Sequence, residues 1–326
     1  IEKYGADGVR MGMMLSAPAG NDILFDDALC EQGRNFCNKI WNSFRLIKGW
    51  EVADTEEPES SKVAVEWFGA KLRSVAAEVE DLMGKFRISE ALMAVYKLFW
   101  DEYSSWYLEV IKPAYGSPID SKTYEATQGF LDDLLRMLHP FMPFITEELW
   151  QHLAERKDGE SIMYAKMPVG GDVDEKLIAG FETVKEIVAG IRTVRKQKQL
   201  PQREALELDV KGPRDTALDC VLIKIGNLSA ITDVEEKNPM ASAFIVGATE
   251  YSVPLNGKIN VEEEIAKLNK DLEYYTKFLA GVEKKLGNER FVANAPEAVV
   301  AVERKKKADA EEKLAAIRAS LASLQG

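Results

Sequence analysis

The chain has few of the residues that most often carry catalysis, metal binding or covalent cross-links. Its 326 residues include three cysteines and two histidines. The cysteines, at positions 30, 37 and 220, are too scattered for a disulfide framework, which favours a reducing, cytoplasmic environment. Cys30 and Cys37 have no histidine pair nearby to complete a zinc site, and no Gly-x-x-x-x-Gly-Lys-Ser/Thr phosphate loop is present. We therefore predict no catalytic residue and no metal site.

Long apolar runs are also missing from the sequence. No segment approaches the roughly 20 apolar residues that a membrane helix needs, so we expect no membrane partner. Residues 1–8 lack the basic-then-apolar order of a signal peptide and include no initiator methionine. We therefore expect the sequence to begin inside a longer protein. With 326 residues, 46% of them hydrophobic, it is long enough for two domains and an appendage.

Positive charge is scarce overall and concentrated in two places. The net charge of −12 argues against a protein that coats nucleic acid by bulk attraction. Residues 187–203 nevertheless contain basic residues and no acidic one: Arg192, Arg195, Lys196, Lys198 and Arg203. The second basic run is Arg304, Lys305, Lys306 and Lys307. Each run is either an ordinary solvated face or a set of discrete phosphate contacts.

Apolar periodicity predicts long amphipathic helices over the first half of the chain. The expected helices cover about residues 6–16, 27–49, 62–84, 88–111, 121–138 and 144–155. Asp26 or Asp27 is expected to cap the second of them, and a polar loop at residues 53–61 precedes the third. The aromatic residues of the fourth are expected to pack in a core, with His139 as a buried, hydrogen-bonded ring. Repeated long helices with short breaks predict a helical bundle.

The period of the pattern changes after a Gly- and Asp-rich linker, which we place at residues 166 to about 180. A helix of about residues 182–198 follows, and a short helix is expected near 216–225. Short strands are expected at about residues 205–210, 230–235, 243–246 and 251–254. Because the loops between them are short, we predict a small α+β module with antiparallel strands.

The last third of the chain contains two helical heptad runs, whose a and d positions we call the seam. In the first run the seam consists of Val261, Ile265, Leu268, Leu272, Tyr275, Leu279, Val282 and Leu286. In the second it consists of Ala310, Leu314, Ile317, Leu321 and Leu324. A turn at residues 287–295 lets the runs fold back as an antiparallel coiled-coil hairpin. Glu303 and Lys307 also fall on the second seam by strict count, which predicts weaker packing at mid-arm.

One stretch of the second helix is polar although its opposite face is apolar. Arg34, Asn38, Asn42 and Arg45 lie three or four residues apart and so share one side of a helix. Asparagine amides can both donate to and accept from a base edge, and arginine can pair with phosphates. The same residues could instead form a capping and interhelical hydrogen-bond set. The pattern alone leaves both interpretations open.

Several segments resemble one family. Residues 261–265 (Val-Glu-Glu-Glu-Ile) and 284–300 (Lys-Lys-Leu-Gly-Asn-Glu-Arg-Phe-Val-Ala-Asn-Ala-Pro-Glu-Ala-Val-Val) closely resemble the C-terminal tRNA-contacting arm of bacterial valyl-tRNA synthetases. Residues 34–42, 106–113 and 138–150 are similar to the anticodon-binding bundle of class I synthetases, and residues 16–25 to its valyl branch. Residues 191–201 resemble the family's basic helix after the bundle. Residues 1–10 resemble the segment just after the KMSKS loop, whereas the HIGH and KMSKS signatures themselves are missing.

The resemblance implies a mainly α fold in four parts. Residues 1–25 would connect to a preceding catalytic domain, and residues 26–165 would form the anticodon-binding helical bundle. Residues 181–257 would form the small α+β domain, and residues 258–326 the antiparallel coiled-coil arm. The expected partners are tRNA(Val) and the missing N-terminal catalytic and editing domains of the same chain, in a cytoplasmic monomer.

The resemblance also implies roles for individual residues. Arg34, Asn38, Asn42 and Arg45 would contact the anticodon, and Trp50, an aromatic residue just past their helix, would stack on a base. Contacts to the tRNA backbone would come from both basic runs: Arg192, Arg195, Lys196, Lys198, Arg304, Lys305, Lys306 and Lys307. The full-length family enzyme uses ATP and Mg²⁺ to ligate valine to tRNA and hydrolyses mischarged threonyl-tRNA. We expect no cofactor and no activity in this part of it.

Two other interpretations differ from this one. The chain could be the equivalent region of an isoleucyl- or leucyl-tRNA synthetase, which would share the bundle but lack the arm. It could instead be an interaction scaffold whose helical hairpin dimerises or docks a protein. Salt separates the scaffold from a tRNA-binding protein, because tRNA binding weakens steeply with salt and an apolar coiled-coil dimer does not.

Overall fold

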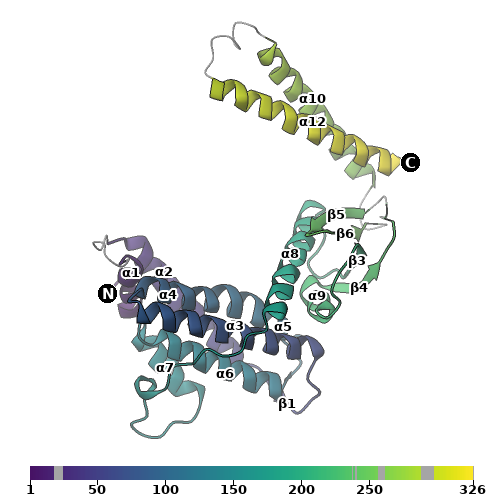
Figure 1. Ribbon diagram of the computed structural model, residues 1–326. Helices are drawn as coiled ribbons and strands as arrows, with labels where there is room; N and C mark the ends of the chain where they lie inside the picture. Colours follow the sequence, from purple (N-terminus) through teal and green to yellow (C-terminus); the bar gives the residue numbers. More distant parts are fainter. Residues whose placement is uncertain (18–24, 237, 239–240, 256–260, 288–296, 326) are drawn as a thin grey trace. The chain divides into compact units, whose positions relative to one another are not determined.

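The computed structural model describes residues 1–17, 25–236, 238, 241–255, 261–287 and 297–325. It divides the chain into two compact units. The first contains residues 1–188 and 215–226, and the second contains residues 189–214 and 227–326. The fold is mainly helical with two small sheets, as Figure 1 shows. Each unit is described by itself below.

The first unit is a bundle of helices, most of them long. Its elements are α1 (Gly5–Leu15), α2 (Asp27–Lys48), α3 (Glu59–Gly84), α4 (Ile88–Lys97), a π-helix (Leu98–Tyr107), α5 (Leu108–Ile111), α6 (Ser121–Leu138), α7 (Pro143–Leu153) and α9 (Asp219–Gly226), with a 3-10 turn at Ile162–Tyr164. The first part of α8 (Glu175–Gln197) also belongs to it. The predicted bundle is therefore confirmed as a helical domain, and most helix ends fall within two residues of the expected ones.

The starts of two long helices were predicted wrongly. Helix α3 begins at Glu59, three residues before the expected start, because Pro58 can occupy the position before a helix. Helix α8 begins at Glu175 and not near residue 182, so the linker expected at residues 166–180 is shorter than predicted. Asp174 accounts for this start, because its carboxylate accepts a hydrogen bond from the Leu177 N–H at 2.9 Å.

Helix α2 has an apolar inner face and a defined start. Asp26 caps it by accepting a hydrogen bond from the Ala28 N–H at 2.8 Å, as the sequence predicts. Its inner face is fully buried at Phe36, Ile40 and Ile47. This packing fixes the direction in which the outer face of α2 points, because the helix cannot rotate about its axis without exposing its apolar stripe.

Helices α1 and α2 approach each other closely through glycines. A Cβ atom at Gly33 would lie 2.5 Å from the Gly8 carbonyl oxygen, and one at Gly12 would lie 2.7 Å from the Cys30 backbone nitrogen. The buried Asp7 carboxylate on α1 also accepts a hydrogen bond from the Ile145 N–H at 2.7 Å, which caps the start of α7. These contacts tie α1 to both of its neighbours.

Aromatic side chains fill the centre of the bundle, as the sequence predicts. The rings of Trp67 and Phe181 stack with centroids 3.7 Å apart. Tyr103 and Tyr107 are fully buried and also stack, at 5.4 Å. The Tyr103 hydroxyl donates to the Thr127 carbonyl oxygen at 3.0 Å, which satisfies a polar group that burial would otherwise leave unpaired. Burial raises the pKa of the Tyr103 hydroxyl well above its ordinary value.

The helix expected at residues 88–111 has the expected length but an unexpected middle. Residues Leu98–Tyr107 wind as a π-helix between α4 and α5. Such segments are rare and are read poorly from apolar periodicity, because they change the number of residues in each turn. A short parallel pair of strands, β1 (Val52–Ala53) and β2 (Ile119–Asp120), was also missed, since residues 53–61 were expected to be loop throughout.

The second unit contains a four-stranded sheet. Its strands are β3 (Leu206–Lys211), β4 (Leu228–Asp233), β5 (Ala241–Val246) and β6 (Thr249–Pro254), in the order β4-β3-β6-β5. β3–β6 and β5–β6 are antiparallel, as expected, but β3 and β4 are parallel, so the prediction of a wholly antiparallel sheet was wrong. Residues 212–227, which include α9, form the crossover that a parallel pair requires.

The arm consists of helices α10 (Val261–Leu286) and α12 (Glu297–Gln325), which lie side by side in Figure 1. Contacts between them join residues in opposite order. The Lys285 and Glu303 side chains lie 3.8 Å apart and the Lys307 and Glu283 side chains 2.9 Å apart, so the two helices run antiparallel. Val282, Ala310, Leu314 and Leu321 of the predicted seam are buried. The predicted turn at residues 287–295 lies almost wholly outside the described residues.

Candidate nucleic-acid interface

The outer face of α2 carries the polar residues that the sequence singles out. Asn38, Asn42 and Arg45 are exposed, and the Arg34 side chain is 41% exposed. Arg34 forms an ion pair with Glu31 at 3.1 Å, and its guanidinium lies 5.9 Å from the ring centroid of Tyr4. We call Arg34, Asn38, Asn42 and Arg45 the polar face of α2. It offers two amides and two guanidinium groups on a helix that the core holds in place, which suits recognition of base edges and phosphates.

Trp50 lies just past the polar face and is half-buried. Helix α2 ends at Lys48 and is followed by its C-cap, Gly49, and the Trp50 N–H donates to the Ile47 carbonyl oxygen at 3.2 Å. Trp50 is therefore held against the last turn of α2. Its role as a stacking residue stays a prediction.

Sequence reasoning missed one residue on this face. Trp41 lies three residues after Asn38 and four before Arg45, and it is 40% exposed. The signal was available in the spacing, since residues 38, 41, 42 and 45 share one side of a helix. The sequence gives no further signal for Trp41, because apolar side chains at helical spacing usually pack in a core.

The basic run of α8 is split between solvent and interior. Arg192 and Lys196 are exposed and Lys198 is half-buried, but Arg195 is only 2% exposed. The Arg195 guanidinium donates hydrogen bonds to the carbonyl oxygens of Pro201 at 3.0 Å, Glu204 at 2.8 Å and Asn227 at 3.1 Å. Arg195 therefore links α8 to the loops around the sheet. The expectation that it contacts the tRNA backbone is wrong, because its guanidinium is buried and bound to backbone carbonyls.

The basic run of α12 is divided in a different way. Arg304 and Lys305 are exposed. Lys306 forms an ion pair with Glu303 at 2.7 Å, and Lys307 forms one with Glu283 at 2.9 Å. The hydrogen bond to Glu283 and the charge of that residue raise the pKa of Lys307. Glu303, predicted on the seam, is 6% exposed. Half of this basic run is therefore engaged within the arm.

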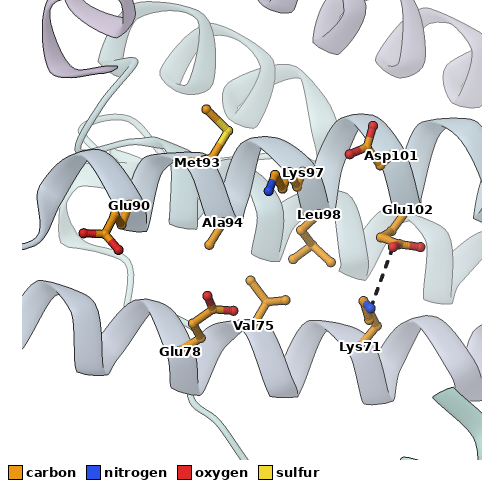
Figure 2. A pocket seen from close by; sticks show the side chains of 10 residues that line it. All are labelled: Lys71, Val75, Glu78, Glu90, Met93, Ala94, Lys97, Leu98, Asp101 and Glu102. Atoms are coloured by element: carbon orange, nitrogen blue, oxygen red, sulfur yellow. Dashed lines mark ion pairs between the residues drawn. The ribbon is translucent and has the colours of Figure 1, made fainter. Parts of the chain in front are cut away.

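A groove between α3 on one side and α4 with the π-helix that follows it on the other has the opposite charge (Figure 2). Its volume is about 450 Å³, and its lining includes the carboxylates of Glu78, Glu90, Asp101 and Glu102. Lys71 points across it toward Glu102, with the charged atoms 3.7 Å apart. Because carboxylates repel phosphates, this groove is a poor site for a nucleic acid.

Other reactive side chains in the described residues are placed for structure. The pKa of Cys37 is raised to about 12 by burial, so its thiol stays protonated near neutral pH. His139 Nδ1 lies 2.8 Å from the Thr146 hydroxyl, as the prediction of a hydrogen-bonded ring requires, but the residue is half-buried and not buried as expected. Partial burial lowers the pKa of this ring. In the same residues no three His, Cys, Asp or Glu side chains gather as metal ligands do. No helix there combines the length and apolar character needed to cross a bilayer.

Two family models match the chain. One, described as the anticodon-binding domain of tRNA ligase, matches residues 65–210. The other, described as the valyl tRNA synthetase tRNA binding arm, matches residues 260–325. The first match begins after α2, so the polar face lies outside both matched segments.

Curated relatives extend the similarity over the whole chain. A valine–tRNA ligase of Phocaeicola vulgatus is 61% identical over 326 residues, which is 100% of this chain and 37% of that protein. One of Parabacteroides distasonis is 61% identical over 325 residues, covering 99% of this chain and 37% of its own length. One of Porphyromonas gingivalis is 57% identical over 326 residues, again 100% of this chain and 37% of the relative. The chain thus spans little more than a third of the length of these relatives.

Fold and matches together define a class, the tRNA-binding portion of an aminoacyl-tRNA synthetase. Within that class, the chain belongs to the valyl-tRNA synthetase family.

Proposed function

We propose that this chain binds tRNA(Val) and reads its anticodon with the outer face of α2. The observation that carries the proposal is the arrangement of α2. Arg34, Asn38, Asn42 and Arg45 face outward, while the opposite side is locked into the core by Phe36 and its neighbours. Valine codons share their first two bases, so adenine and cytosine occur at the matching anticodon positions in every isoacceptor. A face with two amides suits two splayed bases that are read at their edges.

The backbone contacts are proposed to come from the two basic runs. In α8 they are Arg192, Lys196 and Lys198, and Arg195 is left out because its guanidinium is bound to three backbone carbonyls. In α12 they are Arg304 to Lys307, with Arg304 and Lys305 contributing most because Lys306 and Lys307 also form ion pairs. Phosphate contacts of this kind position tRNA and carry no sequence information.

The arm is proposed to be an antiparallel coiled-coil hairpin that clamps the tRNA body. The opposite order of the contacts between α10 and α12 supports this, as do the buried side chains of Val282, Leu314 and Leu321. The four domains expected at residues 1–25, 26–165, 181–257 and 258–326 remain part of this proposal. The third does not coincide with a compact unit, because residues 181–188 and 215–226 belong to the first unit.

For the whole polypeptide we propose the activity of its family: ligation of valine to tRNA(Val) with ATP and Mg²⁺, and hydrolysis of mischarged threonyl-tRNA. A pocket that accepts valine cannot strongly reject threonine, which has nearly the same shape. We assign neither ATP nor Mg²⁺ to residues of this chain. Both reactions would belong to catalytic and editing domains of a cytoplasmic, monomeric enzyme.

A binding competition tests the proposal. The full chain should bind a valine tRNA transcript in a filter assay, and a transcript with the two shared anticodon bases changed should compete at least tenfold less well. Pure protein should show no ATP–pyrophosphate exchange with valine under any divalent-metal condition. Equal competition by both transcripts would remove anticodon reading from the proposal.

One observation favours a second function, protein docking through the arm. Tyr274 and Phe278 are exposed on α10, with their rings stacked at 6.4 Å. A docking or dimerising arm would bury these rings, so helicity or sedimentation would depend on protein concentration. A tRNA-binding arm folded within one chain predicts no such dependence.

A further inference from the structure

The indole of Trp41 lies in the middle of the polar face of α2. On an α-helix, side chains three and four residues apart are neighbours, so Trp41 has Asn38 on one side and Arg45 on the other. Asn42 follows it directly in the chain and is exposed on the same side. The four side chains therefore form one continuous exposed strip on a helix whose far side is buried.

Exposure alone does not make this tryptophan functional, because single exposed apolar residues are common on protein surfaces. Its surroundings are more informative. Trp67 and Trp150 are buried in the bundle, and Lys39 lies 5.3 Å from the ring centroid of the half-buried Trp100. Trp41 is 40% exposed, and its ring lies 6.3 Å from that of Phe44 at a tilt of 41°. The chain therefore presents a broad aromatic surface to solvent among groups that form hydrogen bonds.

We propose that Trp41 is the residue on which an unpaired base of the anticodon loop stacks, with the Asn38 and Asn42 amides placed to read the edges of that base. This inference rests on the proposed function of the polar face and names the chemistry of its ligand, a single-stranded nucleobase. Trp50, expected from the sequence to play this part, is half-buried beyond the end of α2 and then supports the last turn.

The physical argument concerns solvent. A base that stacks on an indole excludes water from both surfaces, and the neighbouring amide hydrogen bonds then form in a less polar environment. Discrimination rises accordingly, because a mismatched base leaves a desolvated amide without its partner. An indole adds no charge, so its share of the binding should not depend on salt, unlike that of the lysines and arginines.

The test compares four variants of the full chain: Trp41→Ala, Trp41→Phe, Trp50→Ala and Leu46→Ala. Leu46 is the matched control because it is another exposed apolar residue on α2, 37% exposed. Trp41→Ala should weaken tRNA(Val) binding about 5- to 150-fold, the range for one base–aromatic stack. Trp41→Phe should stay within about threefold of the natural chain, since it keeps an aromatic face. Leu46→Ala should stay within about twofold, and the salt slope should be the same for all. Trp50→Ala tests the other stacking candidate: a loss smaller than that of Trp41→Ala supports the proposal, and a loss at Trp50→Ala in place of Trp41→Ala overturns it.

A double-mutant cycle then identifies the contact. The natural chain and Trp41→Ala are each measured against tRNA(Val) transcripts with an abasic residue at one anticodon position at a time. At one position the loss caused by Trp41→Ala should disappear, because the base that stacks is no longer there. A Trp41→Ala loss that is equal for all abasic transcripts would overturn the proposal.

Failure of this inference is distinguishable from failure of the proposed function. If the natural chain does not distinguish valine tRNA from the altered transcript, anticodon reading itself fails. If it does distinguish them and Trp41→Ala binds like Leu46→Ala, only the stacking role fails. Should Trp41→Ala lower the melting temperature, the decision rests on Trp41→Phe in tRNA titrations. In these titrations tRNA should quench the tryptophan fluorescence of the natural chain. Loss of that quench in Trp41→Phe supports the proposal, and an unchanged quench overturns it.

Discussion

The polar face of α2 and the basic run of α12 present positive charge in different ways. On α2 two arginines flank two amides, and the helix rests on fully buried side chains such as Phe36 and Ile40. On α12, Lys306 and Lys307 are held by Glu303 and Glu283, and the helix has one other helix beside it. Reading a base edge needs amides fixed in direction, whereas a phosphate contact needs only charge within reach. We therefore expect α2 to recognise anticodon bases and the arm to add affinity for tRNA of any sequence.

The largest effect should come from the buried side of α2. Phe36 is fully buried and meets the Tyr96 ring at 4.8 Å and the Phe99 ring at 5.5 Å. Phe36→Ala should lower the free energy of unfolding by about 3–5 kcal/mol, measured by urea denaturation. Asn35→Ala, exposed on the same helix, should change it by less than about 0.5 kcal/mol. Similar values for both variants would mean that the core does not fix α2.

The next effect concerns recognition on the outer side. Arg45→Ala should weaken tRNA(Val) binding by about 1–3 kcal/mol and reduce the preference for the valine anticodon, with the melting temperature nearly unchanged. Lys48→Ala is the control, because Lys48 is exposed in the last turn of the same helix. Filter binding against cognate and altered transcripts measures both quantities. An equal loss of affinity for both transcripts would make Arg45 a phosphate contact. The charged residues of α2 and α12 would then play the same role.

A smaller, uniform effect is expected at the arm. Replacing Arg304 and Lys305 by alanine should weaken binding of all tRNAs alike, because phosphate contacts are blind to sequence. The slope of log affinity against log salt should fall by roughly 0.7–0.9 for each phosphate contact removed. Arg318→Ala, at an exposed position farther along α12, provides the control. A loss confined to tRNA(Val) would contradict the assignment of the arm to general affinity.

The smallest effect should be a pH dependence of the arm. The pKa of Glu303 is lowered from its ordinary value of 4.5, chiefly because Lys306 donates a hydrogen bond to its carboxylate. A lowered pKa means that ionised Glu303 stabilises the arm above about pH 4.5, and that this contribution is lost as pH falls through the lowered pKa. Circular dichroism at 222 nm should therefore show an acid loss of helicity that Glu303→Gln reduces. Glu311→Gln should leave the loss unchanged.

The helices could be predicted well because their signals are local. The spacing of Phe36, Ile40 and Ile47, the cap at Asp26 and the glycine at position 49 all act within a few residues of α2. The parallel pairing of β3 with β4 could not be read in this way, since it depends on where residues 212–227 carry the chain. The π-helix was hidden for a related reason, because the winding of residues 98–107 does not follow the usual helical period.

The same distinction between local signals and distant partners applies to the candidate site. The outward direction of Asn38, Asn42 and Arg45 follows from their spacing against a buried stripe. The burial of Arg195 does not, because its partners include Asn227, 32 residues farther along the chain. Lys306 pairs with Glu303 on its own helix, whereas one partner of Lys307, Glu283, lies on the other arm helix. The pairing of Lys307 could therefore not be predicted from local spacing.

The close approach of α1 to α2 also sets limits on how this protein can change over evolutionary time. A side chain at Gly33 would collide with the backbone of α1, and one at Gly12 would collide with the backbone and thiol of Cys30. Each obstacle includes backbone atoms, which cannot move aside as the flexible end of a side chain can. In a saturation-mutagenesis library selected for folding, positions 12 and 33 should therefore accept glycine almost alone. The outer positions of α2, only a turn away, would be constrained by their ligand and would drift freely once that ligand was lost.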